Sequence, residues 1–292
     1  MKKKITIITP TYNRAYILDR CYQSLINQTV ESFIWMVVDD GSNDDTEELV
    51  RKWVNENKIT IEYYKKENGG KASALNYAFD RVSTDYLVCL DSDDMFVPSA
   101  VEVAVRELDE KVQKVSYFCG MIALKSDTNG KIIGGVSLPD NVTSSTPDEL
   151  MNKYKLTKAE HDSFYDAKII KGFRFPVFEG EKFVSPSYLN LVLSDKYKFA
   201  ISHYIYTRAE YMEDGLSRNR ITLIKNNPKG YTIVKKLYFM YSNNLIVKSK
   251  HALMYIAGSL LSRNKNFIKN SPNKVMTILL FPLGWLIYKK RF

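Results

Sequence analysis

The sequence predicts an α/β fold with a mostly parallel sheet in its first half, followed by a helical and basic C-terminal region. Apolar runs of strand length alternate with helix-like segments of about a dozen residues, a pattern typical of βαβ units. Polar clusters follow the ends of three of these runs, at the edge where parallel sheets bind ligands. The charge balance also changes, because residues 1–150 carry 17 Lys and Arg against 24 Asp and Glu, whereas residues 151–292 carry 25 against 9.

The first half contains the regular alternation. Strands are expected over residues 5–10, 33–40, 59–66 and 86–90, and helices over 14–27, 44–57, 71–82 and a stretch after Pro98. Acidic residues in the first turn of the second helix suit the helix dipole, and Ser42 or Asn43 is its expected cap. A further strand over 114–125 leads to the turn sequence at 128–131, which is typical of a hairpin.

The second half is less regular and strongly basic. Residues 141–171 are expected to be helical, 172–189 to form a loop and then a short helix, and 232–268 to form one or two helices with basic faces. From Gly215 to Phe292 there is no acidic residue, against 15 Lys and Arg. Such a balance predicts an anionic partner, either nucleic acid or an anionic membrane surface.

An apolar stretch of 14 residues, 275–288, lies near the C-terminal end. Pro282 and Gly284 interrupt it, and it is shorter than the roughly 20 residues that span a bilayer. Trp285, Tyr288 and the flanking Lys and Arg favour an element that lies in the membrane interface, with packing against the protein core as the alternative. We therefore expect a peripheral protein on the inner face of the cell membrane.

The cysteines and the N-terminal sequence point to the cytoplasm. The three cysteines, Cys21, Cys89 and Cys119, are odd in number and lack metal-like spacing, which argues against a disulfide scaffold or structural zinc. MKKK is followed by the strand-like ITIITP, so no signal peptide is expected.

Four polar motifs are expected to share one edge of the sheet. They are TPTYNR after the first strand, DDGSNDD after the second, NGGKASALN at the start of a helix, and DSDD after the fourth strand. Each is weak alone, but together they describe a pocket for a nucleotide diphosphate. Three carboxylates at the end of a buried strand are costly unless a cation lies there. Asp91 and Asp93 are two residues apart and can face one site, which suits Mn²⁺ or Mg²⁺.

In this order and spacing, the motifs resemble the nucleotide-sugar domain of family 2 glycosyltransferases, which have the GT-A fold. The resemblance is strong over roughly the first 100 residues. The later segments FPVFEGEKF and EYMEDGLS resemble, less specifically, the acceptor half of a bacterial polysaccharide-biosynthesis branch of that family. The resemblance implies three parts: a nucleotide-sugar half at 1–125, an acceptor half at 126–231, and a basic membrane-associated region at 232–292.

The resemblance also implies roles for residues of the donor site. Asp93 would bind the metal, Asp91 the ribose or a metal-bound water, and Asp94 would support them. Asp39 or Asp40 would accept a hydrogen bond from the N3–H of uracil, so a UDP-sugar is the leading donor, although TDP has the same edge. The remaining expected donor-site residues are Thr9, Pro10, Tyr12, Arg14, Gly70, Lys71 and Ser92.

The inverting reaction needs a carboxylate that removes the acceptor's proton. The family usually places it in a Glu-Asp pair, but Lys182 stands at the usual Asp position here, so Glu181 is the first candidate and Glu179 the second. Either could instead cap the helix that begins near Ser185.

Three further residues have two interpretations each. His203 could complete the metal shell or pack in the core, and the core is the favoured interpretation. Arg218 and Arg220 could clamp the diphosphate or belong to the basic, membrane-facing surface.

The resemblance implies metal-dependent, inverting transfer of a sugar from a nucleotide-sugar to a lipid-linked or growing polysaccharide acceptor. One alternative is a sugar nucleotidyltransferase, which would need a Gly-rich motif near the N-terminus that TPTYNR does not provide. The other is a non-enzymatic nucleic-acid-binding protein that uses the basic half. No recognised nucleic-acid-binding motif is present, so no nucleic-acid partner is expected.

Overall fold

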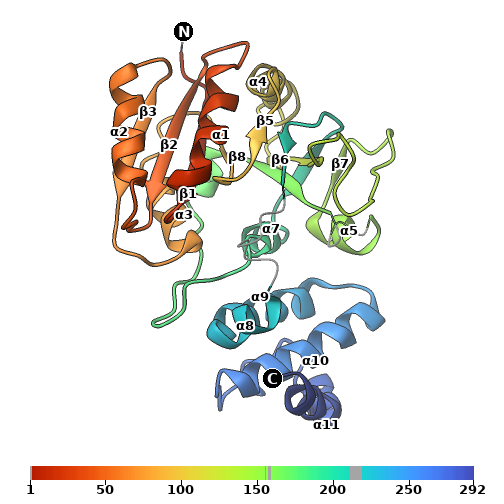
Figure 1. The fold of residues 1–292 in the computed structure, drawn as a ribbon. Helices are drawn as coiled ribbons and strands as arrows, with labels where there is room; N and C mark the ends of the chain where they lie inside the picture. Colours follow the sequence, from red (N-terminus) through yellow and green to blue (C-terminus); the bar gives the residue numbers. More distant parts are fainter. Residues whose placement is uncertain (1, 155, 157–158, 211–218) are drawn as a thin grey trace. The chain divides into compact units, whose positions relative to one another are not determined.

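The structure is a computed structural model that describes residues 2–154, 156, 159–210 and 219–292 (Figure 1). The chain divides into two compact units, which we treat separately. Unit 1 comprises Met1–Arg174 and Lys196–Met212, and unit 2 comprises Phe175–Asp195 and Glu213–Phe292. The expected division into three parts by role stays a prediction, because compactness does not test role.

Unit 1 is built on an eight-stranded sheet with the order β3-β2-β1-β4-β8-β6-β9-β7. Strands β3, β2, β1 and β4 are parallel to one another, which confirms the mostly parallel α/β sheet expected from the sequence. The strands are β1 Ile5–Thr11, β2 Phe33–Asp39, β3 Ile61–Lys65, β4 Tyr86–Cys89, β6 Phe118–Leu124, β7 Ser144–Ser145, β8 His161–Asp166 and β9 Lys198–Ser202. A second, two-stranded sheet joins β5 Met95–Phe96 to β10 Thr207–Arg208.

Helices flank this sheet and bury one apolar face each (Figure 1). On α1 the buried side chains Leu18, Tyr22 and Leu25 recur at helical spacing, as the sequence pattern predicts. Tyr22 stacks on Trp53 with ring centroids 4.3 Å apart, which ties α1 to α2. The helices of unit 1 are α1 Ala15–Ile26, α2 Thr46–Glu56, α3 Lys71–Phe79, α4 Ala100–Lys111, α5 Pro147–Asn152 and α6 Ala167–Ile170.

The expectation that 141–171 is helical is wrong for much of that range. Strand β8 lies there and pairs antiparallel with both β4 and β6. Its sequence, HDSFYD, is polar and includes Asp162, which is buried in the strand. The carboxylate of Asp162 lies 3.6 Å from the ammonium group of Lys125. A charged pair within the sheet therefore conceals the strand from a search for apolar runs.

The hairpin expected after β6 is present in a minimal form, with one antiparallel bridge across its turn. The carboxylate of Asp127 accepts hydrogen bonds from the N–H groups of Asn129 and Lys131, forming an Asx-type turn. This turn closes the single antiparallel bridge between Ser126 and Ile132. Strand β6 itself pairs with β8 and β9.

Unit 2 is helical: α7 Ser187–Leu193, α8 Arg220–Asn226, α9 Pro228–Tyr241, α10 Leu245–Leu261 and α11 Lys274–Arg291. A small core joins the last three helices, where Phe239, Tyr255 and Ile256 are buried. Gly284 allows α11 to approach α10 closely, because a Cβ at that position would lie 2.6 Å from Ile256 Cγ2. Across the residues described, every helix falls short of the length and apolarity that crossing a bilayer demands.

Candidate active site

The register of the parallel strands brings three of the polar motifs to one edge of unit 1. Thr11 at the end of β1 lies opposite Asp39 at the end of β2, and Ile8 of β1 lies opposite Cys89 at the end of β4. The loops that follow β1, β2 and β4 therefore begin side by side. The motifs expected to share an edge do share it.

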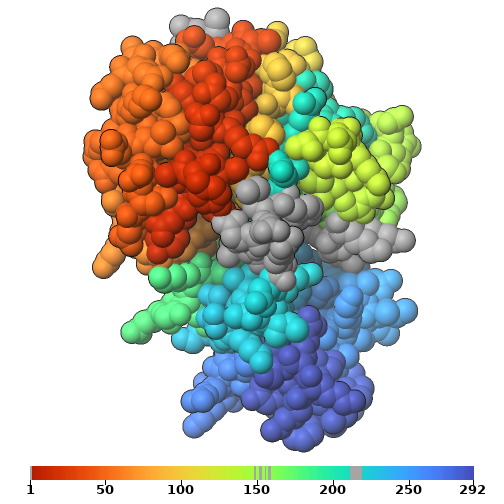
Figure 2. Space-filling model, in the orientation of Figure 1, coloured from red at the N-terminus to blue at the C-terminus, as the bar shows by residue number. Residues whose placement is uncertain are grey.

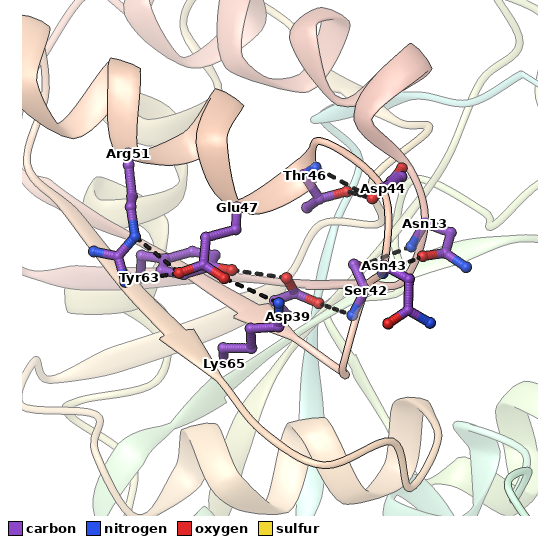
Figure 3. A network of polar contacts seen from close by, with 10 residues as sticks. All are labelled: Asn13, Asp39, Ser42, Asn43, Asp44, Thr46, Glu47, Arg51, Tyr63 and Lys65. Atoms are coloured by element: carbon purple, nitrogen blue, oxygen red, sulfur yellow. Dashed lines mark hydrogen bonds and ion pairs between the residues drawn. The ribbon is translucent and has the colours of Figure 1, made fainter.

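Asp39 is fully buried and fixes the loop after β2 (Figure 3). Its Oδ1 accepts a hydrogen bond from the Ser42 N–H at 2.7 Å, and its Oδ2 accepts one from the Tyr63 hydroxyl at 2.7 Å. Burial, together with this carboxylate, raises the pKa of Tyr63 above its ordinary value, so the hydroxyl stays a donor. In this structure Asp39 therefore organises the loop and is not exposed to a base.

Asp40 is also buried, and it holds the NGG loop. Its carboxylate accepts hydrogen bonds from Lys66 Nζ at 2.7 Å, from the Gly69 N–H at 3.0 Å and from the Gly70 N–H at 2.6 Å. Gly70 adopts a φ of 84°, a left-handed conformation that suits glycine. The N–H of Gly70, which we expected to face phosphate groups, is thus engaged within the protein.

The loops after β1 and β2 are bonded to each other (Figure 3). Ser42 Oγ accepts a hydrogen bond from the Asn13 N–H at 2.9 Å, and Asn13 Oδ1 accepts one from the Asn43 N–H at 2.8 Å. Asp44 accepts hydrogen bonds from the N–H groups of Ala15 and Thr46. Asp44, rather than Ser42 or Asn43, therefore satisfies a donor at the start of α2.

Asp91 is paired with Lys71 at the start of α3. Lys71 Nζ lies 2.5 and 2.7 Å from the two carboxylate oxygens of Asp91. Burial alone would raise the pKa of Asp91, but the charges of Lys71 and Lys125 outweigh it and hold that pKa below its usual range. Asp91 is therefore ionised, and Lys71 already occupies the position next to it where a cation was expected.

A second buried lysine supports the same loop. Lys125, at the end of β6, lies 2.5 Å from Asp94 and 3.6 Å from Asp162. Burial raises the pKa of Asp94, and Lys125 opposes that shift. Asp94 thus anchors the loop after β4 through its ion pair with Lys125, and its supporting role at the donor site stays a prediction. Lys125 and Asp162 were not among the residues predicted for the site. The one signal for Lys125 in the sequence is its position directly after the apolar run of β6.

Asp93 is the carboxylate of this motif that lacks a cationic partner among the described residues. It is half-buried, and burial together with the charge of Asp91 raises the pKa of Asp93 above its ordinary value, with Arg14 and Lys71 opposing. A divalent cation would stabilise its charged form. Mg²⁺ and similar ions often use one or two carboxylates and complete their shell with substrate phosphates, so Asp93 fits such an ion.

His203, which was also considered as a metal ligand, does not join Asp93. Within the described parts of the chain, no three His, Cys, Asp or Glu side chains gather to hold a metal ion. His203 follows β9 in an exposed loop, and its Nε2 lies 3.2 Å from the carbonyl oxygen of Val142. Both interpretations of His203 are corrected: it neither completes the metal site nor packs in the core.

Thr9 also differs from expectation. Its side chain is fully buried, and its hydroxyl oxygen accepts a hydrogen bond from Trp35 Nε1 at 2.9 Å, so it faces the core rather than a pocket. Around the same sheet edge, Tyr12 is 45% exposed, Pro10 and Arg14 are half-buried, and Ser92 is buried.

The candidate bases lie in unit 2. The two oxygens of Glu181 accept hydrogen bonds from the N–H groups of Lys229 and Gly230 at 2.9 and 2.8 Å, at the start of α9. Glu181 therefore caps α9 and not the helix near Ser185. Glu179 is exposed, with no hydrogen-bonded partner among the described residues. Arg220 is exposed at the start of α8, and Arg218 lies outside the described residues.

The chain resembles known proteins in the part that carries these motifs. The family model described as "Glycosyl transferase family 2" matches residues 6–179. The glycosyltransferase GlyA of Streptococcus pneumoniae is 28% identical over 262 residues, which cover 80% of this chain and 36% of that protein. The chondroitin synthase of Pasteurella multocida is 39% identical over 103 residues, 35% of this chain and 11% of that protein.

A third relative is the "GalNAc(5)-diNAcBac-PP-undecaprenol beta-1,3-glucosyltransferase" of Campylobacter jejuni. It is 26% identical over 174 residues, which cover 59% of this chain and 54% of that protein. The chain thus matches no more than 54% of the length of these three relatives.

Solved structures share the fold. S. aureus TarS 1-349 in complex with UDP-GlcNAc has a TM-score of 0.59 at 16% identity, covering 98% of this chain and 92% of that one. The mannosyltransferase PcManGT from Pyrobaculum calidifontis in complex with GDP-Man and Mn²⁺ has a TM-score of 0.59 at 15% identity, covering 99% and 83%. At these identities the likeness shows the fold alone.

Proposed function

The chain belongs to glycosyl transferase family 2 and has the GT-A fold, and from this we propose that it moves a sugar from a UDP-sugar to a lipid-linked or growing polysaccharide acceptor, with inversion. Family membership favours glycosyl transfer over nucleotidyl transfer and nucleic-acid binding. The observation that carries the proposal is Asp93, a carboxylate without an ion-pair partner among the described residues of the site. TarS and PcManGT share the fold that positions this site.

Within the donor site, the residues have separable tasks. Asp93 would hold Mn²⁺ or Mg²⁺, which supplies positive charge against the departing diphosphate. Lys71 holds Asp91 in place and presents an ammonium group at the start of α3. The charge of Arg14 acts on Asp93, so Arg14 would add positive charge near the phosphates of the donor. Asp39 and Asp40 preserve the loop shapes, and Asp39 is fully buried in this structure.

The names of relatives support the choice of donor and acceptor. TarS has been solved with UDP-GlcNAc, and the Campylobacter relative carries a PP-undecaprenol compound in its name. A UDP-sugar donor and a lipid-linked acceptor are therefore the first substrates to test. Glu181 is the proposed base, because the start of α9 holds its carboxylate in one position.

A donor screen tests the proposed function. The full chain is incubated with a panel of UDP-, TDP- and GDP-sugars, with Mn²⁺ or with EDTA, and the released nucleotide is measured. We expect release from at least one UDP-sugar, at least about tenfold faster with Mn²⁺, because the ion stabilises the leaving diphosphate. Calorimetry that finds no binding of UDP, TDP or any sugar nucleotide in the presence of Mn²⁺ would refute the proposal.

We also propose that α11 attaches unit 2 to an anionic membrane surface. One face of α11 packs on α10 through Met276, Leu280 and Phe281, so the two interpretations of the tail are both partly supported. The opposite face is apolar and exposed, which is unusual for a surface in water. Figure 2 shows the surface of α11 in dark blue. Its exposed side chains are Val275, Ile278, Leu279, Leu283 and Leu286.

Introducing charge on this face is expected to release the protein from vesicles. Ile278→Glu together with Leu279→Glu should weaken binding to phosphatidylglycerol vesicles by at least about 100-fold, because two apolar side chains that the membrane would bury are lost. Co-sedimentation measures the bound fraction. Val177→Glu is the matched control, since Val177 is 61% exposed on a loop of unit 2. Unchanged sedimentation of the double variant would count against the membrane face.

A further inference from the structure

Unit 2 contains a group of cations in the stretch of sequence after Asp214, which has no acidic residue. Lys235, on α9, is half-buried, and its Nζ lies 5.3 Å from the ring centroids of both Tyr231 and Tyr238. The charges of three further cations reach it: Arg220, Lys250 and Arg291. Burial first, and then these charges, lower the pKa of Lys235 to about 8. We call these four residues the cationic cluster.

Nothing on the described protein neutralises this cluster. No carboxylate lies within ion-pair distance of its members in the described residues, and the sequence has no Asp or Glu after Asp214. Arg220, Lys250 and Arg291 are exposed, but Lys235 is half-buried, so its charge costs stability unless an anion offsets it. In the same region, His251 stacks on Tyr238 with centroids 4.6 Å apart, and its buried Nδ1 has no hydrogen-bond partner in the described residues. Polar atoms that are buried in this way usually have a partner, which can be an ordered water.

An apolar cavity adjoins the cationic cluster. It has a volume of about 540 Å³, and its walls come from α8, α10 and α11. Arg291 belongs to both the cavity and the cationic cluster, and Ile221 in the cavity directly follows Arg220. The lining side chains are Ile221, Leu253, Leu283, Leu286, Ile287 and Lys290, besides Arg291. An apolar wall and a set of cations therefore meet at Arg291 within one unit.

We propose that unit 2 binds a single-chain lipid diphosphate, with the diphosphate at the cationic cluster and the start of the hydrocarbon chain in the apolar cavity. Arg and Lys are the side chains that bind phosphate oxygens, and Arg does so in bidentate fashion. Four cations match the two to three charges of a diphosphate better than the single charge of a membrane phosphodiester. The inference rests on the proposed function, in which the acceptor is lipid-linked, and it names where that lipid's headgroup binds.

Tryptophan fluorescence can report this binding directly. The chain has three Trp residues. Trp35 and Trp53 are buried in unit 1, whereas Trp285 lies on α11 beside Leu286 and is 43% exposed. Titrating geranylgeranyl diphosphate into the full chain, without nucleotide or metal, should give a saturable blue shift. Geranylgeraniol and inorganic pyrophosphate, each lacking one half of the ligand, should bind at least roughly tenfold more weakly.

Two variants test the cationic cluster. Lys235→Met and Arg291→Gln should each weaken the binding of geranylgeranyl diphosphate at least roughly tenfold. Lys269→Gln removes the same charge from an exposed position outside the cationic cluster and should bind like the native chain. Lys235→Met should also raise the melting temperature of the lipid-free protein, because it removes an uncompensated charge while keeping an apolar stem. A structural role alone would lower that temperature.

Several results would overturn the inference. They are equal affinity for geranylgeraniol, equal affinity for inorganic pyrophosphate, equal affinity for phosphatidylglycerol, or native affinity in both variants. The donor screen separates this inference from the proposed function. Donor hydrolysis without lipid binding would overturn the lipid site alone, whereas lipid binding without any donor turnover would leave the site and refute the transferase proposal.

Discussion

Replacing Asp93 by Asn is expected to reduce metal-dependent release of UDP from the donor by about 100- to 1,000-fold. Asp93 is the carboxylate of the DSDD motif that Lys71 and Lys125 leave unpaired in the described site. An amide of the same size fills the same space but offers a divalent cation a much weaker ligand. Nucleotide release at saturating Mn²⁺ measures the effect. Turnover that still depends on Mn²⁺ at the native rate would contradict the metal assignment.

The same variant should be at least as stable as the native chain when metal is absent. The folded-state pKa of Asp93 is raised, so ionising this carboxylate opposes folding as the pH rises from the ordinary pKa through the raised one. Asn has no such penalty, and the gain should vanish in acid, below both pKa values. The melting temperature against pH, with and without Mn²⁺, tests this. Mn²⁺ should raise the melting temperature of the native chain but not of Asp93→Asn.

Asp140→Asn is the matched control for Asp93→Asn. Asp140 is exposed in a loop of unit 1, away from the DSDD motif in sequence. Its replacement should change neither the turnover nor the response of the melting temperature to Mn²⁺. A loss of the Mn²⁺ response in both variants would indicate a general charge effect in place of a ligand at Asp93.

The parallel strands and their helices could be predicted because local sequence determines them. The strands β1, β2 and β4 bury nearly every residue, so they are continuous apolar runs, and α1 buries Leu18, Tyr22 and Leu25 at helical spacing. Because parallel strands align their carboxyl ends, the sequence also predicted that the polar motifs share an edge. Both predictions needed no knowledge of distant contacts.

Strand β8 could not be predicted in this way, because its stability depends on a partner far along the chain. Asp162 is buried in β8, and its carboxylate lies 3.6 Å from the ammonium group of Lys125, the residue that follows β6. Neither residue alone indicates a strand, and a buried ion pair becomes visible only when the two strands are placed side by side. The same limit applies to the support that Lys125 gives Asp94.

The individual roles of the site residues were harder to predict than their location. Asp39 and Asp40 lie where expected, but Tyr63 and Gly70 occupy their oxygens. Lys71 lies beside Asp91 and leaves Asp93 as the open carboxylate. Such assignments depend on which donor reaches which oxygen, and that is fixed by side-chain geometry, which residue types and spacing do not specify.

Replacing Glu181 by Gln is expected to reduce sugar transfer by about 100- to 10,000-fold, the usual contribution of a general base, and to leave UDP binding unchanged. The two backbone N–H groups at the start of α9 use one lone pair on each oxygen of Glu181. Each oxygen keeps a second lone pair that can accept the proton of an acceptor hydroxyl. Because the carboxylate is held in place, it can meet the demand of a base for a fixed position. Transfer to a lipid-linked acceptor and calorimetry with UDP measure the two effects.

Stability distinguishes this catalytic role from capping alone. The amide group of Gln has one oxygen in place of two, so Glu181→Gln should lose one of the two hydrogen bonds and about 1 kcal/mol of the free energy of unfolding. Glu179→Gln, two residues away on an exposed and unpaired carboxylate, is the matched control and should keep both transfer and stability. If Glu181 only caps α9, its variant will melt earlier but transfer normally per folded molecule. Loss of transfer in Glu179→Gln alone would move the base to Glu179, because the transfer reaction requires one free carboxylate.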